Sequence, residues 1–474
     1  MAYKKRLTFG LIVATRNIFN KKLAEEARPT LLKKMEQLGH DYVILDEDKT
    51  PTNGSIETYE DAQACAKLFR AHRDDIDGII VVLPNFGYEV GVVNSISLSD
   101  LNVPVLVQAC DDENDKVDLK SRRDAFCGKL SVCNNLYQYG IPFTDTSLHT
   151  YPLDSEWFEK DVRKFAAVCR VVNGLRKARI GMIGIRPGGF QTVRFSEKLL
   201  QQSGITIIPV DMSEMIANAK AIDPKSAEVQ QKIAELKAYG KIPAVISEET
   251  IAKQAAFGVA VENWIVANEV DATSIQCWDA LEKNYGCTSC VTMSMLGEKL
   301  LPSACEADIA GAVSMYALML ATGKSPALLD WNNNFAEDRN KCVCTHCSNY
   351  PKSFFNSEIE IASLDVLGTV LGQVDTFGAV KGKVAAGPMT YFRISTDDTL
   401  GRIKAYTGEG RITNDPYAMA GGIAVTEIPN LQQLMKFMCK NGFEHHVAMV
   451  RGEVVEVIEE AMESYIGWDL YKHE

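Results

Sequence analysis

Short apolar runs alternate with amphipathic stretches through the first third of the chain. Residues 6–14 (RLTFGLIVA), 77–84 and 103–109 are apolar and β-branched, as in buried strands, and residues 21–39 place apolar side chains at helical spacing. Apolar strands separated by helices are typical of a parallel sheet covered on both faces. We therefore expect a Rossmann-like N-terminal domain over residues 1–172.

The same alternation returns in the middle of the chain. RIGMIGIRPGGF (179–190) predicts a strand and a turn, and ATSIQCW (272–278) a further strand. PSACEADIAGAVSMYALMLATG (302–323) predicts a long helix, and PALLDWNNN (326–334) a strand with a polar exit. These elements predict a second Rossmann-like domain over residues 173–355.

A different pattern begins at residue 356. Short, β-branched segments interrupted by glycine, such as AVKGKVAAGPMTYFRIS and GIAVTEI, predict antiparallel strands. LQQLMKFMCKNG and GEVVEVIEEAMESY predict two helices. We expect residues 356–474 to form an antiparallel β-barrel domain. The predicted fold class is therefore α/β, with two doubly wound Rossmann-like domains followed by a C-terminal barrel.

Composition narrows the classes of function. The 474 residues carry a formal net charge of -12, which disfavours nucleic acid and anionic membranes as partners, because phosphate binding needs clustered Lys and Arg. No apolar run reaches the roughly 18 residues that span a bilayer, and the N-terminal stretch resembles a strand more than a signal peptide. The 13 cysteines are an odd number, and many lie in apolar runs. They are expected to be reduced, which favours a cytoplasmic protein.

Two acidic residues of the second domain are candidates for chemistry. Glu306 follows Ser303 by three residues, so a capping box at the start of a helix explains it without any function. Asp330 closes the strand LLD, and carboxylates at the C-terminal ends of parallel strands project into the crevice where α/β proteins bind ligands. An aspartate that caps a turn with its own backbone is the structural alternative.

His445 and His446 are adjacent in a chain that has only seven histidines. Neighbouring residues of a strand face opposite sides, so only one of the two is expected to reach a given site. Taken singly, each is better explained as an ordinary core or surface histidine.

Two further motifs suggest other functions. CTSC (287–290) and CTHC (344–347) are C-x2-C pairs that a structural zinc site would use, but the gap of more than 50 residues between them is long for one site. The turn IGIRPGGF follows a strand, as a nucleotide-binding turn does, but it lacks the G-x-G-x-x-G spacing. We therefore reject NAD binding as the leading interpretation.

Polar and aromatic residues follow two strands of the first domain. Arg16, Asn17 and Phe19 follow the first strand, and Asn85 and Phe86 follow a later one. The carboxyl ends of parallel strands meet at one edge of a sheet, where an arginine, amides and aromatic rings would suit a sugar. An ordinary loop at the start of a helix is the structural alternative.

Together, several segments resemble the L-fucose isomerase and L-arabinose isomerase superfamily, particularly its shorter fucose-isomerase-like branch. The matching segments are ATRNIFN, IGIRPGGF, SIQCW, PSACEADIAGA, LLDWNNN, CTHCSNYP, GPMTYFRIS and EHHVAMVRG, in the family's order. The most specific part is the ACEAD and LLDWNN pair followed by HH. The resemblance implies two Rossmann-like domains, a β-barrel domain, and interconversion of aldoses and ketoses with Mn²⁺ or a similar cation such as Mg²⁺, Co²⁺ or Zn²⁺.

The resemblance also assigns residues. Glu306 and Asp330 match the family's two acidic metal ligands, which also form its acid/base pair, and one of His445 and His446 matches its histidine ligand. Likeness to the arabinose isomerases, in which the second histidine of the pair binds metal, favours His446. His346 stands where arabinose isomerases carry another ligand, which makes it a fourth ligand or a substrate contact. Family members form trimers or hexamers in which a neighbouring subunit's first domain completes the site. The residues expected to contact the sugar are Arg16, Asn17, Phe19, Asn85, Phe86, Gln276, Asn332, His346, Tyr391 and His445.

The implied reaction moves hydrogen between C1 and C2 of a deoxyhexose, pentose or modified hexose through a cis-enediol. It needs a base beside the carbon and a cation that stabilises the developing charge. Glu306 and Asp330 are expected to accept and return the proton. Two alternatives are an enzyme for a sulfonated or phosphorylated sugar, held by Arg16 and Arg186, and a non-catalytic sugar-binding or regulatory protein.

Overall fold

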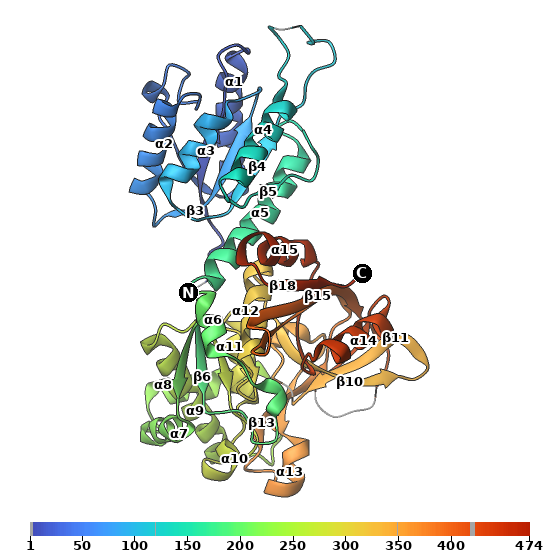
Figure 1. Cartoon of the computed structure of the whole chain (residues 1–474). Coiled ribbons are helices and arrows are strands. Elements are labelled where there is room, and N and C mark those ends of the chain that lie inside the picture. Colours follow the sequence, from blue (N-terminus) through green and yellow to red (C-terminus); the bar gives the residue numbers. More distant parts are fainter. Residues whose placement is uncertain (1–2, 119, 348, 418–421) are drawn as a thin grey trace. The chain divides into compact units, whose positions relative to one another are not determined.

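The computed structural model describes residues 3–118, 120–347, 349–417 and 422–474. The chain forms two compact units (Figure 1). The N-terminal unit contains Lys4–Asn173 and a segment from near the C-terminus, Glu460–Gly467. The C-terminal unit contains Gly174–Glu459 and Trp468–Glu474.

The N-terminal unit is built on a parallel sheet of five strands in the order β2-β1-β3-β4-β5. Helices α1 and α5 pack on one face, and α2, α3 and α4 pack on the other. The predicted doubly wound first sheet is therefore confirmed. Its elements are β1 (Thr8–Val13), α1 (Lys22–Leu38), β2 (Asp41–Ile44), η1 (Glu47–Lys49), α2 (Tyr59–Ala71), β3 (Ile76–Leu83), α3 (Glu89–Ser99), β4 (Val105–Ala109), α4 (Ala125–Gln138), β5 (Thr144–Asp145), α5 (Glu156–Leu175) and the π-helical turn η4 (Ala461–Ile466).

Helix α1 illustrates how the local sequence decides this part of the fold. Its buried residues include Leu23, Ala27, Leu31 and Met35, which recur every four positions and so form one apolar stripe. Gly39 adopts φ 76°, and its N–H bonds back to the last turn of the helix. The helix consequently ends where its apolar period ends.

The C-terminal unit begins with a second parallel sheet, of four strands in the order β7-β6-β8-β9. The second predicted α/β sheet is confirmed in this form. Its elements are β6 (Arg179–Ile183), η2 (Gln191–Val193), α6 (Glu197–Gln202), β7 (Thr206–Val210), α7 (Met212–Ala221), α8 (Ala227–Tyr239), α9 (Glu248–Ala267), β8 (Ala272–Ile275), α10 (Ala280–Asn284), α11 (Cys290–Glu298), β9 (Ser303–Cys305) and α12 (Ile309–Thr322).

The same unit continues into a mixed, largely antiparallel sheet of nine strands in the order β12-β13-β16-β11-β10-β17-β14-β15-β18. Because β15 also pairs with β16, the strands from β16 to β15 form a closed ring, which is the structure's counterpart of the predicted barrel. The elements are β10 (Ala327–Phe335), β11 (Asp338–His346), η3 (Lys352–Phe354), β12 (Glu360–Ser363), α13 (Asp365–Leu371), β13 (Phe377–Lys383), β14 (Gly387–Asp397), β15 (Arg402–Ile412), β16 (Gly422–Glu427), α14 (Leu431–Asn441), β17 (His446–Arg451), α15 (Val455–Glu460) and β18 (Asp469–Lys472).

Two local predictions were wrong. Residues 326–334 do not extend the parallel sheet, because β10 pairs antiparallel with β11 and β17, and Asp330 lies inside that strand instead of at its end. The capping box at Ser303 and Glu306 does not form either. Ser303 lies in β9, and α12 begins later, with Asp308 as the cap that accepts from the N–H of Gly311.

Candidate metal centre

Glu306 lies in a strained turn that joins β9 to α12. Its φ is 61° and that of Ala307 is 53°, a left-handed conformation that costs energy for residues other than glycine. A second turn, after the neighbouring strand β8, places Trp278 at φ 57°, and its indole Nε1 donates to Glu306 Oε1 at 2.9 Å. The two strained turns therefore hold one carboxylate oxygen of Glu306 and leave the other, Oε2, for another partner.

Antiparallel pairing brings the remaining candidates to the same place. Asp330 on β10 is paired with Thr345 on β11 and with His446 on β17. His446 Nε2 lies 3.3 Å from Asp330 Oδ1 and 3.3 Å from Glu306 Oε2. His346 Nε2 lies 3.9 Å from Asp330 Oδ1. Three residues from the nine-stranded sheet thus converge on the glutamate that follows the parallel sheet.

The converging atoms fit a divalent cation. Glu306 Oε2, Asp330 Oδ1, His446 Nε2 and both ring nitrogens of His346 are buried without a hydrogen-bond partner among the described residues. Leaving a buried polar group unsatisfied costs about 1–3 kcal/mol, so several at one point call for a common partner. Glu306, His346 and His446 offer ligand atoms within 4.8 Å of one another, as do Asp330, His445 and His446. Carboxylate and imidazole ligands together suit Mn²⁺, Co²⁺ or Zn²⁺ better than Mg²⁺.

Electrostatics tie these groups together. Burial opposes ionisation of Glu306, but His446, His346 and the Trp278 indole outweigh it and hold the pKa of Glu306 below its ordinary value. Burial likewise disfavours the charged form of His446, yet the neighbouring carboxylates of Asp308, Glu306 and Asp330 raise its pKa to about 10. The site is therefore an anionic pocket that attracts positive charge.

Asp308 and Arg393 adjoin these groups and were not among the residues predicted from the sequence. His446 Nδ1 lies 2.8 Å from Asp308 Oδ2, and Arg393 donates to both oxygens of the same carboxylate, at 2.5 and 3.1 Å. Arg393 Nε also reaches Glu444 Oε2 at 3.4 Å. Asp308 lies two residues after Glu306 in ACEAD, and Arg393 lies in GPMTYFRIS on β14. Both segments belong to the family resemblance, but nothing in the sequence assigned a role to either residue.

Four other residues of this unit were predicted to contact the sugar, and they differ in exposure and in their hydrogen-bond partners. His445 is 41% exposed in its side chain, with Nε2 3.8 Å from Asp330 Oδ1. Gln276 Oε1 accepts from the N–H of Ile185 and so fixes the turn after β6. Asn332 Oδ1 accepts from the N–H of Thr345, 2.6 Å away. Tyr391 is fully buried between Trp331 and Tyr406, a core position within the ring of strands.

The N-terminal unit brings its own candidates together. The guanidinium of Arg16 lies over the rings of Phe86 (4.8 Å) and Tyr88 (4.3 Å), and Phe19 stacks on Phe86 with ring centres 5.6 Å apart. Arg16 Nε is buried and has no hydrogen-bond partner in residues 3–118 or the other described ranges. These residues follow β1 and β3, neighbours at the point of the sheet where the strand order reverses.

Two amides complete this edge. Asn85 is fully buried and donates to Thr15 Oγ1 at 3.0 Å, whereas Asn17 uses its backbone N–H to bond Glu57. Asn85 is thus a structural support of the loop, and the side chain of Asn17 is left for another contact.

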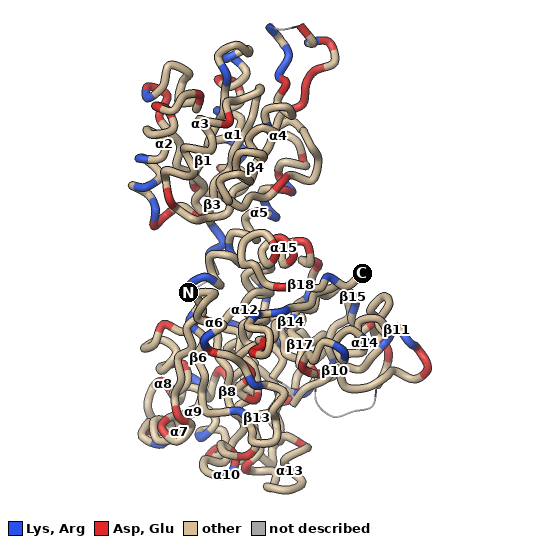
Figure 2. Tube along the Cα trace, in the orientation of Figure 1, with Lys and Arg blue, Asp and Glu red and all other residues tan. Residues whose placement is uncertain are grey.

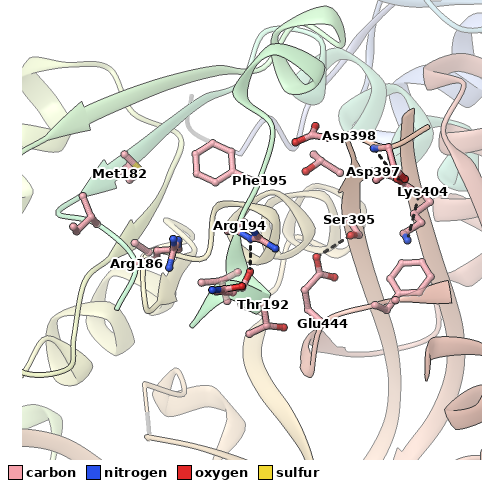
Figure 3. Close-up of a pocket in the computed structure, with 18 residues that line it drawn as sticks. Met182, Arg186, Thr192, Arg194, Phe195, Ser395, Asp397, Asp398, Lys404 and Glu444 are labelled. Atoms are coloured by element: carbon pink, nitrogen blue, oxygen red, sulfur yellow. Dashed lines mark hydrogen bonds and ion pairs between the residues drawn. The ribbon is translucent and has the colours of Figure 1, made fainter. Parts of the chain in front are cut away.

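The C-terminal unit contains a cavity of about 770 Å³ (Figure 3), lined in part by neighbours in sequence of the candidate metal ligands. It shares Ala307 and Glu444 with the segments that carry Glu306 and His445. Arg186 and Arg194 line it from the loop after β6, and they bond only backbone carbonyls, with no carboxylate partner among the described residues. Over both units as a whole, acidic and basic residues are interspersed (Figure 2).

The thiols do not assemble into the zinc site that two C-x2-C pairs would require. Cys344 lies 3.7 Å from Cys342 instead, and among the described residues one thiol-containing set could hold a metal: Cys277, Cys305 and Glu306. Cys277 and Cys305 lie 3.1 Å apart, sulfur to sulfur, in the apolar core. None of the described helices combines the length and apolar character needed to cross a membrane.

Much of this chain is similar in sequence to known proteins. Residues 10–176 match the fucose/sulfoquinovose isomerase N-terminal domain, and residues 344–474 match the L-fucose isomerase C-terminal domain. A sulfoquinovose isomerase of Priestia aryabhattai is 26% identical over 337 residues, 71% of this chain and 73% of that protein. Sulfoquinovose isomerases of Alkalicoccus urumqiensis (27% over 296 residues, 62% and 64%) and Clostridium sp. (24% over 324 residues, 67% of each) are also similar.

The two matched segments contain His346, Arg393 and His446, whereas Glu306 and Asp330 lie between them. Both terminal domains of one isomerase family occur here in the family's order, and the C-terminal unit contains a buried set of carboxylates and imidazoles. The chain belongs to the fucose/sulfoquinovose isomerase family, whose members are aldose–ketose isomerases.

Proposed function

We propose that this protein is a metal-dependent aldose–ketose isomerase. Glu306, Asp330 and His446 hold the cation, with His346 as a fourth ligand and Mn²⁺ as the preferred ion. The observation that carries this proposal is the convergence of buried oxygen and nitrogen atoms that have no hydrogen-bond partner in the described part of the chain. A helix cap at Glu306 or an ordinary core histidine at position 446 would leave no such set of atoms.

A bound cation would act as a Lewis acid that polarises the sugar's carbonyl oxygen and offsets the negative charge developing on the oxygens of C1 and C2. The protein's own residues move the proton. Trp278 holds Glu306 through Oε1, which leaves Oε2 as the oxygen available to the cation and to the proton of the substrate. Asp330, 25% exposed in its side chain, is the partner carboxylate that accepts or returns the proton on the other carbon.

We further propose that the substrate is an aldose with an anionic group at the end distant from C1, such as a sulfonated hexose. The similar proteins named sulfoquinovose isomerases support this choice. Arg186 and Arg194 support it as well, because they line the cavity of the C-terminal unit without carboxylate partners among the described residues. A planar guanidinium binds sulfonate, phosphate or carboxylate through paired hydrogen bonds.

The N-terminal edge has a separate role in this proposal. Arg16, Phe19 and Phe86 form a cation and aromatic surface suited to a sugar, and we place it in the active site of a neighbouring copy in a homo-oligomer of trimeric or hexameric form. Arg16→Ala should then raise KM without changing the affinity for Mn²⁺. Asn17 is expected to contact the sugar at the same edge.

A panel of aldoses assayed with Mn²⁺ tests the proposal. Sulfoquinovose, glucose 6-phosphate, L-fucose and L-arabinose separate anionic from neutral substrates. The proposal expects the ketose product from an anionic sugar, with kcat/KM at least tenfold above that for the neutral sugars. Turnover of neutral sugars alone would overturn the substrate class but keep the isomerase, and no Mn²⁺-dependent turnover of any of them would contradict the isomerase itself.

A further inference from the structure

We propose that Asp308 and Arg393 are positioning residues that fix the tautomer and orientation of His446. This inference rests on the proposed function, because it concerns the ring that holds the cation. It assigns a role to two residues that contact neither the converging ligand atoms nor the cavity.

The carboxylate of Asp308 is fully buried, and both of its oxygens have hydrogen-bond partners. It accepts from Gly311 N at 2.9 Å and from Arg393 Nη1 and Nη2 at 2.5 and 3.1 Å, and it lies 2.8 Å from His446 Nδ1. Because the Arg393 guanidinium donates to both of its oxygens, Asp308 is paired as a carboxylate and not as a neutral acid. Asp308 therefore acts only as an acceptor, and Nδ1 of His446 must carry the hydrogen between them.

The position of this hydrogen determines whether Nε2 of His446 can bind a cation. With hydrogen on Nδ1, the lone pair of the neutral ring lies on Nε2, the atom 3.3 Å from both Glu306 Oε2 and Asp330 Oδ1. The opposite tautomer would place a hydrogen where a cation has to bind. A carboxylate behind a histidine ligand commonly fixes the ring in this way and raises its basicity.

Arg393 fixes the position of Asp308 and of the chain just before His446. Its side chain is fully buried and bridges Asp308 and Glu444, and Glu444 in turn accepts from Ser395 Oγ at 2.8 Å. Glu444 lies two residues before His446, so the arginine ties the start of β17 to the cap of α12. The ring is therefore held both through its nitrogen and through its backbone.

A capping role alone does not explain this arrangement. A helix N-cap needs one acceptor, which serine or asparagine supplies without burying charge. Replacing a buried ion pair with apolar residues is often neutral or even stabilising, so stability gives little reason for a buried arginine here. The contact with His446 is the feature that requires a full carboxylate, and a carboxylate in this place requires Arg393.

Titration with Co²⁺, followed by its visible absorption, tests this role in the purified full-length protein. Asp308→Asn keeps the shape and the helix cap but removes the charge, and should weaken Co²⁺ binding by about ten- to a hundredfold and alter the absorption bands. Arg393→Lys keeps a charge but loses the paired hydrogen bonds, and should weaken binding by a smaller factor in the same direction. It also serves as the test if Asp308→Asn does not fold.

Asp161→Asn is the matched control. Asp161 is a buried carboxylate of the N-terminal unit that accepts from Ser147 and Tyr151. Its replacement should lower the melting temperature and leave Co²⁺ affinity and the absorption bands unchanged.

The outcomes separate this inference from the proposed function. If Asp308→Asn or Arg393→Lys lowers the melting temperature but keeps the wild-type dissociation constant within twofold and the wild-type spectrum, the positioning role is overturned and the metal site stands. If the wild-type protein takes up no Co²⁺, the proposed metal site is overturned, and the positioning role falls with it.

Discussion

Asp330 and His446 face one another on neighbouring antiparallel strands, with Asp330 Oδ1 3.3 Å from His446 Nε2. More than a hundred residues of sequence separate them, and the pairing of β10 with β17 is what places them opposite one another. Glu306 meets the same nitrogen from a strained turn outside that sheet. The proposed centre therefore depends on two different sheets.

Glu306→Gln should remove turnover while the protein remains folded. The amide cannot accept the proton from the sugar carbon, and a positioned acid/base group contributes about 10²- to 10⁴-fold to the rate. The initial rate with Mn²⁺ and the near-ultraviolet circular dichroism together measure the effect. Glu282→Gln, the same change at another buried glutamate of this unit, is the control and should keep wild-type turnover. A fully active Glu306→Gln protein would sink the assignment.

His346→Asn and His445→Asn should have different effects. The ring of His346 is buried and neither of its nitrogens has a hydrogen-bond partner within the residues that the structure describes, so its loss should weaken Mn²⁺ binding at least tenfold. His445 is more exposed, so its loss should raise KM for the sugar and change Mn²⁺ affinity little. Calorimetric titration with Mn²⁺ and steady-state kinetics distinguish them. The reverse pattern would make His445 the ligand and His346 a substrate contact.

Arg186→Met should change substrate preference and not the chemistry. Methionine keeps much of the side chain's length but offers no donor to an anion. We expect kcat/KM for an anionic aldose to fall at least tenfold, mainly through KM, with Mn²⁺ affinity unchanged. Lys225→Met is the control, since Lys225 lies on the surface of the same unit, outside the residues that line the cavity. An equal loss for neutral and anionic sugars would argue against an anion site.

Glu282 should make stability depend on pH. Burial, together with the nearby charge of Asp279, raises the pKa of Glu282 from 4.5 to about 7, and neither carboxyl oxygen has a partner among the described residues. Since the folded state holds this proton more tightly than the unfolded state, its contribution is fully present below pH 4.5 and is lost as pH rises to about 7. The shift corresponds to about 3 kcal/mol in the free energy of unfolding.

Glu282→Gln isolates this effect. Glutamine mimics the neutral acid, so the variant should gain stability relative to the wild type between pH 5 and pH 8, approaching about 3 kcal/mol. Urea unfolding of both proteins at the two pH values gives the difference and cancels the other titrating groups. An identical difference at both pH values would show that Glu282 is ionised in the folded protein throughout.

The alternation of strands and helices in the N-terminal unit followed from the sequence alone. Apolar period and glycine stops are local properties, as the four-residue stripe and Gly39 of α1 show. The same local reasoning misplaced β10, because LLDWNNN is equally compatible with a parallel strand and with the antiparallel strand it forms. The sequence of a short apolar strand does not indicate which other strand it pairs with, or in which direction.

The sequence by itself determined the α/β class of the first two sheets, the acidic character of the chain and, through its resemblance to a family, the candidates Glu306, Asp330 and His446. Only the tertiary structure showed that these three residues converge and that His346 lies with them. It also showed that Asp308 contacts Nδ1 of His446 and is itself bound by Arg393. The reason is physical. Periodicity reports contacts a few residues apart, whereas the hydrogen bond between Asp308 and His446 joins positions separated by 138 residues and exists only once strand pairing has brought β17 beside α12.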